Sequence, residues 1–427
     1  MKKIRFREGA PVSLGQSQHW VCGCSGDGKR DGDAVPADDG KRTLAIRSRI
    51  SENTGSSITT GEGVSMHPAA LESEHGMEAI DLFCGSGGLS IGLTQAGISV
   101  RACVEINRDA MSTYVHHNPD AIHFNEDVRG VDFSRFRGDI DLVAGGPPCQ
   151  PFSIGGLRRG RKDERDMIPE FIRCLNEARP EAFIMENVPG LMLKKSRAYF
   201  MSVLEKLRQC GYRLNWAILN SADFGVPQKR RRLFVLGAKR QHLRFPMPTH
   251  GERGAAPHRT AMAALGPDPI GESPNCPVKF ARDPDLRPSP YAGHIYNGGG
   301  RPIDPDGPCH TILASAGGYK THWIDTLGVA FEYHAHLMAG GKPRDGYVPG
   351  ARRLSVEESA ILQGFPSDLV FSGKRSAQYK QVGDAVPPGL ARSLAVAVRS
   401  QLAGAAEDNQ LEELPPLVHD VQKELPL

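Results

Sequence analysis

Short apolar runs alternate with amphipathic stretches through the segment 77–237, a pattern that predicts strands separated by helices. Residues 142–144 form a continuously apolar run, which is typical of a buried strand. The predicted strands lie at 78–83, 98–104, 121–124, 139–144, 182–185, 213–219 and 233–236, and the predicted helices follow Gly88 and Asn107 and span 168–179 and 198–209. This order is that of an α/β protein built from βαβ units.

The pattern changes between residues 238 and 350, where proline, glycine and histidine are frequent and long periodic runs are few. We therefore expect a small domain inserted into the larger one. Helical periodicity returns where Ser355 and Glu358 form a capping box for a helix that ends at Gly364. A last helix, opened by 379–388, is predicted at 390–402. The expected organisation is an extension at 1–76, a catalytic domain at 77–237 and 351–403, an inserted domain at 238–350 and an acidic tail at 404–427.

The first 76 residues are rich in Gly, Ser, Asp and Lys and poor in large apolar side chains. Such a segment buries too little apolar surface to offset its ordering entropy, so we expect it to be disordered. The folded part is expected to begin near Met77. The tail from Gly404 is expected to be frayed.

Composition limits the possible classes of protein. The 427 residues are 39% hydrophobic and 24% charged, with a formal net charge of +3, as in an ordinary globular protein. No apolar run approaches about 18 residues and no signal-peptide core follows the N-terminus, so we expect no membrane span and a cytoplasmic location. The nine cysteines form no C-x-x-C pair, and Cys22 and Cys24 stand alone, which argues against a disulfide framework and a bound metal.

The strongest chemical signal is Cys149, which lies in the sequence GGPPCQPFS at 145–153, directly after a predicted strand. The glycines let the chain turn out of the sheet at the strand's carboxyl end, and the two prolines restrict the backbone before the cysteine. A free cysteine is more often a small buried hydrophobe. The flanking residues favour a presented nucleophile over that alternative.

A glycine-rich turn at 84–88 leads into the first helix, and Glu105 ends the second strand about twenty residues later. This is the pattern of a nucleotide site in which the acid binds ribose hydroxyls. Ser90 at the last position of the phosphate-binding pattern disfavours a pyrophosphate, so S-adenosylmethionine is the leading candidate. Asp127 is expected to accept a hydrogen bond from an adenine amino group. The alternatives are that the glycine-rich turn binds no ligand and that Asp127 is an acid of a surface loop.

A basic, glycine-rich segment at 155–165 follows the cysteine loop. Glycines make such a segment mobile and guanidinium groups bind phosphates, so we expect a lid that closes over a nucleic acid. Solvated basic loops are the common alternative. The candidate phosphate-binding residues are Arg158, Arg159, Arg161, Lys162 and Arg165.

Further polar side chains are predicted to meet Cys149 at the carboxyl edge of the sheet, where open α/β sheets bind ligands. Glu186 follows the strand 182–185. In an extended chain alternate side chains share a face, so Arg230 and Arg232 are expected on one side, facing the crevice.

Six motifs occur in the order found in the DNA (cytosine-5) methyltransferase family, which the sequence closely resembles from residue 77 to about residue 401. They are D-L-F-x-G-x-G-G at 81–88, P-P-C-Q-P-F-S at 147–153, E-N-V at 186–188, Q-K-R-x-R at 228–232, L-Q-G-F-P at 362–366 and Q-V-G-x-A-V-P at 381–387. The resemblance implies a Rossmann-like, S-adenosylmethionine-dependent methyltransferase fold with an inserted target-recognition domain. It implies a monomeric, prokaryotic-type enzyme that methylates C5 of a flipped cytosine in double-stranded DNA, with or without a companion restriction endonuclease.

The resemblance also implies roles for single residues. Cys149 corresponds to the nucleophile that adds to C6, Glu186 to the residue that holds the cytosine N3 edge, and Arg232, with Arg230, to the arginines near the base. Thr311 corresponds to a residue that is structural or contacts DNA phosphate. The positions that correspond to cofactor contacts are Asp81, Phe83, Gly85, Gly87, Glu105, Ile106, Asp127, Val128, Pro148, Asp384 and Ala385.

One position departs from the family pattern, because Asp384 stands where the family usually has Asn. A carboxylate has no amide donor, which puts this cofactor contact in question. Two other functions remain open: an RNA cytosine methyltransferase and a DNA-binding regulator without turnover. The RNA-methylating branch typically carries a Cys-Phe-Thr tripeptide in the target domain, and this sequence has none.

Overall fold

The computed structural model describes residues 76–148, 166–406 and 410–412. The predictions for most of the N-terminal extension, for the end of the acidic tail, and for Cys149, Arg158, Arg159, Arg161, Lys162 and Arg165 lie outside these residues.

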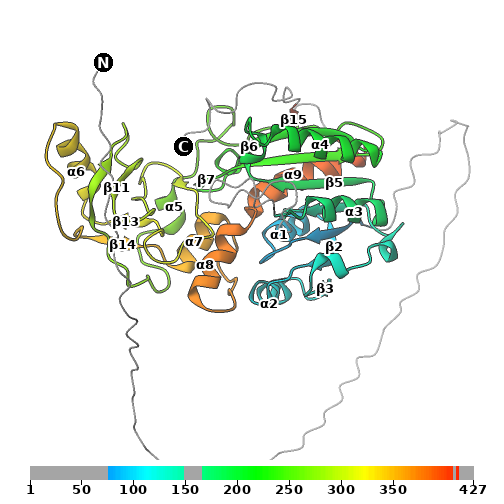
Figure 1. Cartoon of the computed structure of the whole chain (residues 1–427), viewed down its shortest axis with the longest axis horizontal. Helices are drawn as coiled ribbons and strands as arrows, with labels where there is room; N and C mark the ends of the chain where they lie inside the picture. The colour runs from blue at the N-terminus through cyan, green and yellow to red at the C-terminus, as the bar shows by residue number, and fades with distance from the viewer. Residues whose placement is uncertain (1–75, 149–165, 407–409, 413–427) are drawn as a thin grey trace, which may run out of the picture. The chain divides into compact units, whose positions relative to one another are not determined.

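A seven-stranded sheet has the strand order β3-β2-β1-β4-β5-β8-β6. Figure 1 shows β3, β2, β5 and β6 in that order from bottom to top. Its pairs are parallel except that β8 runs antiparallel to both β5 and β6. The strands are β1 (Glu78–Leu82), β2 (Ser99–Val104), β3 (Ile122–Phe124), β4 (Leu142–Gly145), β5 (Ala182–Asn187), β6 (Arg213–Asn220) and β8 (Arg231–Ala238). The predicted α/β class is confirmed.

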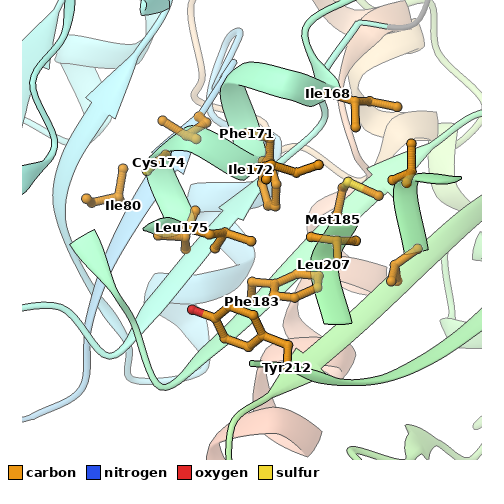
Figure 2. Close-up of a cluster of buried hydrophobic side chains, with 14 of the residues drawn as sticks. Ile80, Ile168, Phe171, Ile172, Cys174, Leu175, Phe183, Met185, Leu207 and Tyr212 are labelled. Atoms are coloured by element: carbon orange, nitrogen blue, oxygen red, sulfur yellow. The ribbon is translucent and has the colours of Figure 1, made fainter. Parts of the chain in front are cut away.

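Helices cover both faces of this sheet because its strands are apolar on both sides. In β5, Phe183 belongs to one buried cluster and its neighbour Ile184 to another. Figure 2 shows the first cluster, in which Phe183 meets Phe171 edge to face at 5.9 Å between ring centroids. The covering helices are α3 (Ile168–Ala178) and α4 (Arg197–Gln209) on the first face and α1 (Gly88–Gln95) and α9 (Pro388–Leu402) on the second.

Two predicted helix starts are confirmed. The Asn107 side chain accepts a hydrogen bond from the Ala110 N–H at the start of α2 (Arg108–His117). Ser355 and Glu358 form the full capping box of α7 (Val356–Gln363), which ends at Gly364. Single-turn 3-10 helices connect other elements: η1 (Val128–Gly130), η2 (Ser134–Phe136), η5 (Pro189–Met192) and η6 (Ser221–Phe224).

The segment predicted to open the last helix forms a helix of its own, α8 (Arg375–Asp384). Pro387 is the N-cap of α9 and Pro388 its first residue. Because a residue before proline is biased away from helical conformation, the two prolines separate α8 from α9. Similarly, Arg230 lies between two strands, β7 (Gln228–Lys229) and β8, where one strand from residue 233 was predicted.

The region predicted as an inserted domain contributes to two buried clusters. One contains Trp323 and Tyr333 and lies wholly between residues 278 and 351. The other joins Ile303 and Ile312 to residues of α7 and α8. The elements of this region are β9 (Phe245–Pro246), α5 (Ala261–Leu265), β10 (Phe280–Asp285), β11 (His294–Tyr296), β12 (Cys309–His310), β13 (Trp323–Asp325) and α6 (Val329–Met338), and β14 (Ala351–Arg353) follows directly after it.

The C-terminal segment differs from the frayed tail predicted from Gly404. Strand β15 (Leu411–Glu412) pairs antiparallel with β9, and Leu411 is buried. Burial of the apolar Leu411 side chain holds this part of the acidic tail against the fold. Within the described ranges, no helix combines the length and the apolar character needed to cross a membrane.

Candidate active site

A cavity of about 940 Å³ lies where the carboxyl ends of β1, β2, β4 and β5 meet the start of β8. Residues 312–314 of the inserted region and the C-terminal end of α8 complete its wall. Parallel strands present their carboxyl ends at one edge of a sheet, which explains why polar side chains far apart in sequence meet here.

Glu186 and Arg232 face each other in this cavity. The Arg232 Nε lies 3.0 Å from Glu186 Oε1. The Glu186 side chain is 13% exposed and the Arg232 side chain 16%. Gly146 makes room for them, since a Cβ there would lie 2.9 Å from Glu186 Oε2. Burial raises the pKa of Glu186, and the Arg232 charge offsets part of that rise. The pair is thus a carboxyl group with an increased affinity for a proton beside a fixed cation.

The base of the cysteine loop is fixed beside this pair. The Asn187 side-chain amide donates to the Pro147 carbonyl over 3.1 Å. The Met167 N–H donates to the Pro148 carbonyl over 2.9 Å. Pro148, the residue before Cys149, therefore lines the cavity that Glu186 also lines. Sequence reasoning gave Asn187 no role, although it belongs to the motif at 186–188.

Glu105 is held by backbone donors at the edge of the cavity. Its Oε2 accepts from the Gly85 N–H over 3.0 Å and its Oε1 from the Asn107 N–H over 2.7 Å. Burial raises the pKa of Glu105. Each carboxylate oxygen has a second lone pair, so the group still has acceptor sites for hydroxyl donors in the cavity.

Asp81 is fully buried and only half satisfied. Its Oδ2 accepts from the Ser90 hydroxyl over 2.6 Å, and Tyr114 lies 2.7 Å beyond that hydroxyl. Its Oδ1 has no hydrogen-bond partner in the described chain, although Asp81 lines the cavity. Burial raises the pKa of Asp81 to about 7. An unpartnered buried carboxylate oxygen at a cavity wall suits a cationic ligand group.

Replacing Asp81 with asparagine is expected to flatten the pH dependence of stability. The folded pKa lies above the unfolded value of about 3.9, so the stabilising effect of the bound proton is lost as pH rises through about 7. As the pH rises from about 5 to about 8, the wild type should lose on the order of 2 kcal/mol of unfolding free energy relative to Asp81→Asn. Chemical denaturation at both pH values tests this, with exposed Asp120→Asn as control. Parallel curves for Asp81→Asn and wild type would contradict it.

The other predicted cofactor positions also border the cavity, with one exception. Phe83 follows β1 with a left-handed φ of 60°, and the Ile106 side chain is 65% exposed. Both apolar residues line the cavity. The Asp127 carboxylate accepts from the Arg129 N–H and pairs with its guanidinium at 2.5 Å, which lowers the pKa of Asp127 to about 2. Phe83, Gly85, Glu105, Ile106, Asp127, Val128, Pro148, Asp384 and Ala385 all line the cavity, whereas Gly87 caps α1.

Arg230 does not join the pair formed by Glu186 and Arg232. Its side chain is buried and donates to the Ile312 carbonyl over 3.1 Å and to the Gly383 carbonyl over 2.8 Å. It therefore ties the inserted region to α8 at the cavity wall. Arg231, as the alternation predicts, lines a separate cavity of about 320 Å³. These contacts support a positioning role for Arg230, and its predicted catalytic role stays a prediction.

Arg230→Met is expected to loosen this connection. The Ile312 and Gly383 carbonyls would lose a charged donor, which should lower the unfolding free energy by about 2 kcal/mol. KM should rise and kcat change less, because the cavity wall moves while Glu186 and Arg232 stay in place. Denaturation and steady-state kinetics would test this. A loss of kcat at unchanged stability would point to direct catalysis instead.

Thr311 is held within the protein. Its hydroxyl donates to the Lys229 carbonyl over 2.7 Å, and β12 pairs with β7 at this point. The contact supports the structural alternative for Thr311, while a phosphate contact stays a prediction. No group of three or more His, Cys, Asp or Glu arranged for metal binding occurs among the described residues.

At the end of α8, the Lys380 ammonium forms an ion pair with the Asp384 carboxylate. Both side chains line the cavity. Sequence reasoning identified Asp384 and missed Lys380, although the spacing of four residues on a helix was a usable signal.

Comparisons with known proteins show the family of this chain. Residues 77–262 and 320–400 match the family described as C-5 cytosine-specific DNA methylase. The Type II methyltransferase M.AplI of Arthrospira platensis is 34% identical over 331 residues, 76% of this chain and 86% of that protein. The Type II methyltransferase M1.HphI of Haemophilus parahaemolyticus is 33% identical over 75% of this chain and 86% of its own length.

Solved structures share the fold. A mutant of Spodoptera frugiperda DNMT2 superposes with a TM-score of 0.57 at 17% identity, covering 75% of this chain and 99% of that chain. The S. pombe Dnmt2 methyltransferase has a TM-score of 0.54 at 18% identity, covering 77% of this chain and 99% of that chain. The family match spans more than half of the sequence and contains β1, β5 and β8, so this chain belongs to the C-5 cytosine-specific DNA methylase family.

Proposed function

We propose that this protein transfers a methyl group from S-adenosylmethionine to C5 of cytosine in double-stranded DNA, at a specific short sequence. The observation that carries the proposal is the buried pair of Glu186 and Arg232, 3.0 Å apart beside Pro148. The description of the matching family, C-5 cytosine-specific DNA methylase, supports DNA as the substrate.

The cavity residues fit S-adenosylmethionine. Glu105 has acceptor lone pairs for ribose hydroxyls, and the exposed side chain of Ile106 offers an apolar surface to adenine. The unpartnered Asp81 Oδ1 suits the α-ammonium group. When bound, S-adenosylmethionine supplies an electrophilic methyl group.

In the proposed mechanism Cys149 forms a covalent adduct with the base. Its thiolate adds to C6, and the electrons of the C5–C6 double bond form the new bond from C5 to the methyl group while the bond between that methyl group and the sulfonium sulfur breaks. An ordinary thiol with a pKa of about 8.5 is only a few per cent ionised at neutral pH. Cys149 follows Pro148, which lines the same cavity as Arg232, so the Arg232 cation is proposed to favour the thiolate. Loss of the C5 proton to solvent and departure of the thiolate from C6 then restore the aromatic base.

Glu186 stabilises this adduct. In its protonated form it donates a hydrogen bond to N3 and so offsets the negative charge that thiolate addition places there. The pKa of Glu186, raised by burial, favours that form. Arg232 fixes the orientation of the carboxyl group through its 3.0 Å contact.

The target cytosine must leave the duplex to enter such a cavity, at a cost of a few kcal/mol. The basic segment 155–165 is proposed to close over the flipped base and to bind phosphates. The inserted region 238–350 is proposed to read base edges in the major groove.

The decisive test is transfer of a labelled methyl group into plasmid DNA, followed by bisulfite sequencing, with a reaction lacking S-adenosylmethionine as control. Methylcytosine at one recurring short sequence is the expected result. A competition between plasmid DNA and transfer RNA would identify an RNA enzyme. DNA binding without any transfer would identify a regulator.

A further inference from the structure

The ion pair of Lys380 and Asp384 lies in the cavity rather than on an outer face of α8. Both side chains line it, and they remain 59% and 50% exposed, so a ligand there would contact them. The Lys380 charge acts on Glu105, whose pKa is raised by burial and lowered by Lys380. Lys380 is thus near the carboxylate that is proposed to bind ribose.

The proposed cofactor contacts imply that one end of the cofactor lies near this pair. In the proposed arrangement Ile106 and Asp127 contact the adenine and Glu105 the ribose. The amino-acid end then extends toward Asp81 and the end of α8. That end carries an ammonium group and a carboxylate, and Asp81 offers a partner for the ammonium group only.

The carboxylate needs a cation or N–H donors. Among the described cations at the cavity wall, Arg129 pairs with Asp127, Arg232 pairs with Glu186, and Arg230 binds backbone carbonyls. Lys380 contacts a half-exposed carboxylate and has three N–H donors, of which one suffices for Asp384.

We propose that Lys380, held in place by Asp384, binds the carboxylate of the cofactor's amino-acid end. This rests on the proposed function. It also accounts for Asp at a position where the resemblance leads one to expect Asn: the donor that the amide would supply comes from Lys380, and the Asp384 carboxylate orients it.

Two ligands separate this role from a general effect on the cavity. S-adenosylhomocysteine carries the amino-acid end, whereas 5′-methylthioadenosine lacks it and keeps the adenosine. In calorimetry, Lys380→Met is expected to raise the Kd of S-adenosylhomocysteine at least about tenfold. The Kd of 5′-methylthioadenosine should change less than about twofold. The matched control is Arg375→Met, which removes a cation of α8 that pairs with Glu272 and does not line the cavity.

Asp384→Asn tests the second half of the proposal. An amide at this position supplies its own donor. In the Asp384→Asn background, Lys380→Met should therefore weaken the binding of S-adenosylhomocysteine less than about threefold, and the effects of the two substitutions should not add. Equal weakening of both ligands by Lys380→Met, or no weakening of either, would overturn the proposal. If the wild type binds neither ligand, the proposed function itself fails.

Discussion

Cys149→Ser is expected to abolish methyl transfer, by roughly 10⁴-fold or more, while cofactor binding stays within about twofold. A serine hydroxyl is scarcely ionised at neutral pH and is a weak nucleophile at C6, and the Arg232 cation cannot compensate for that difference. Single-turnover transfer of a labelled methyl group measures the loss. Calorimetry with S-adenosylhomocysteine shows whether the cofactor site is intact.

A second measurement reports on the covalent bond itself. DNA with 5-fluorocytosine at the target position cannot lose a proton from C5, so the adduct should persist and migrate with the protein on a denaturing gel. Wild type should form this complex and Cys149→Ser should not. Cys210→Ser, at a partly buried cysteine outside the cavity, is the matched control. An adduct with Cys149→Ser would assign the nucleophile elsewhere.

Glu186→Gln is expected to lower kcat by roughly 10²- to 10³-fold. Glutamine keeps the shape of the side chain, but it lacks the acidic proton that is proposed to hydrogen-bond to N3, and it replaces the carboxyl group that lies 3.0 Å from Arg232. KM for DNA should change far less, because the loss concerns the adduct more than the ground state. Single-turnover kinetics with saturating DNA provides the measurement.

Stability separates this result from unfolding. Removing one member of a nearly buried ion pair is costly in general, so the denaturation midpoint of Glu186→Gln must be compared with that of wild type. The control is Glu205→Gln, on an exposed face of α4. Full activity in Glu186→Gln would remove the carboxyl group from the proposed mechanism.

The sequence alone determined the order of the main strands and helices between residues 77 and 237 and the edge of the sheet where polar groups meet. Local rules suffice for these features, because apolar period and capping residues act within a few positions, as Asn107 and the Ser355–Glu358 capping box show. The same rules predicted that Arg230 and Arg232 share a face opposite Arg231.

The tertiary structure decided how those side chains are used. The partners of Arg230 lie 82 and 153 residues away, at Ile312 and Gly383, so no local pattern contains them. The unpartnered oxygen of Asp81 and the raised pKa of Glu186 result from burial by packed neighbours. Desolvation depends on the whole fold, which is why the sequence identified these residues and only the structure showed that Arg232 pairs with Glu186 while Arg230 binds backbone carbonyls.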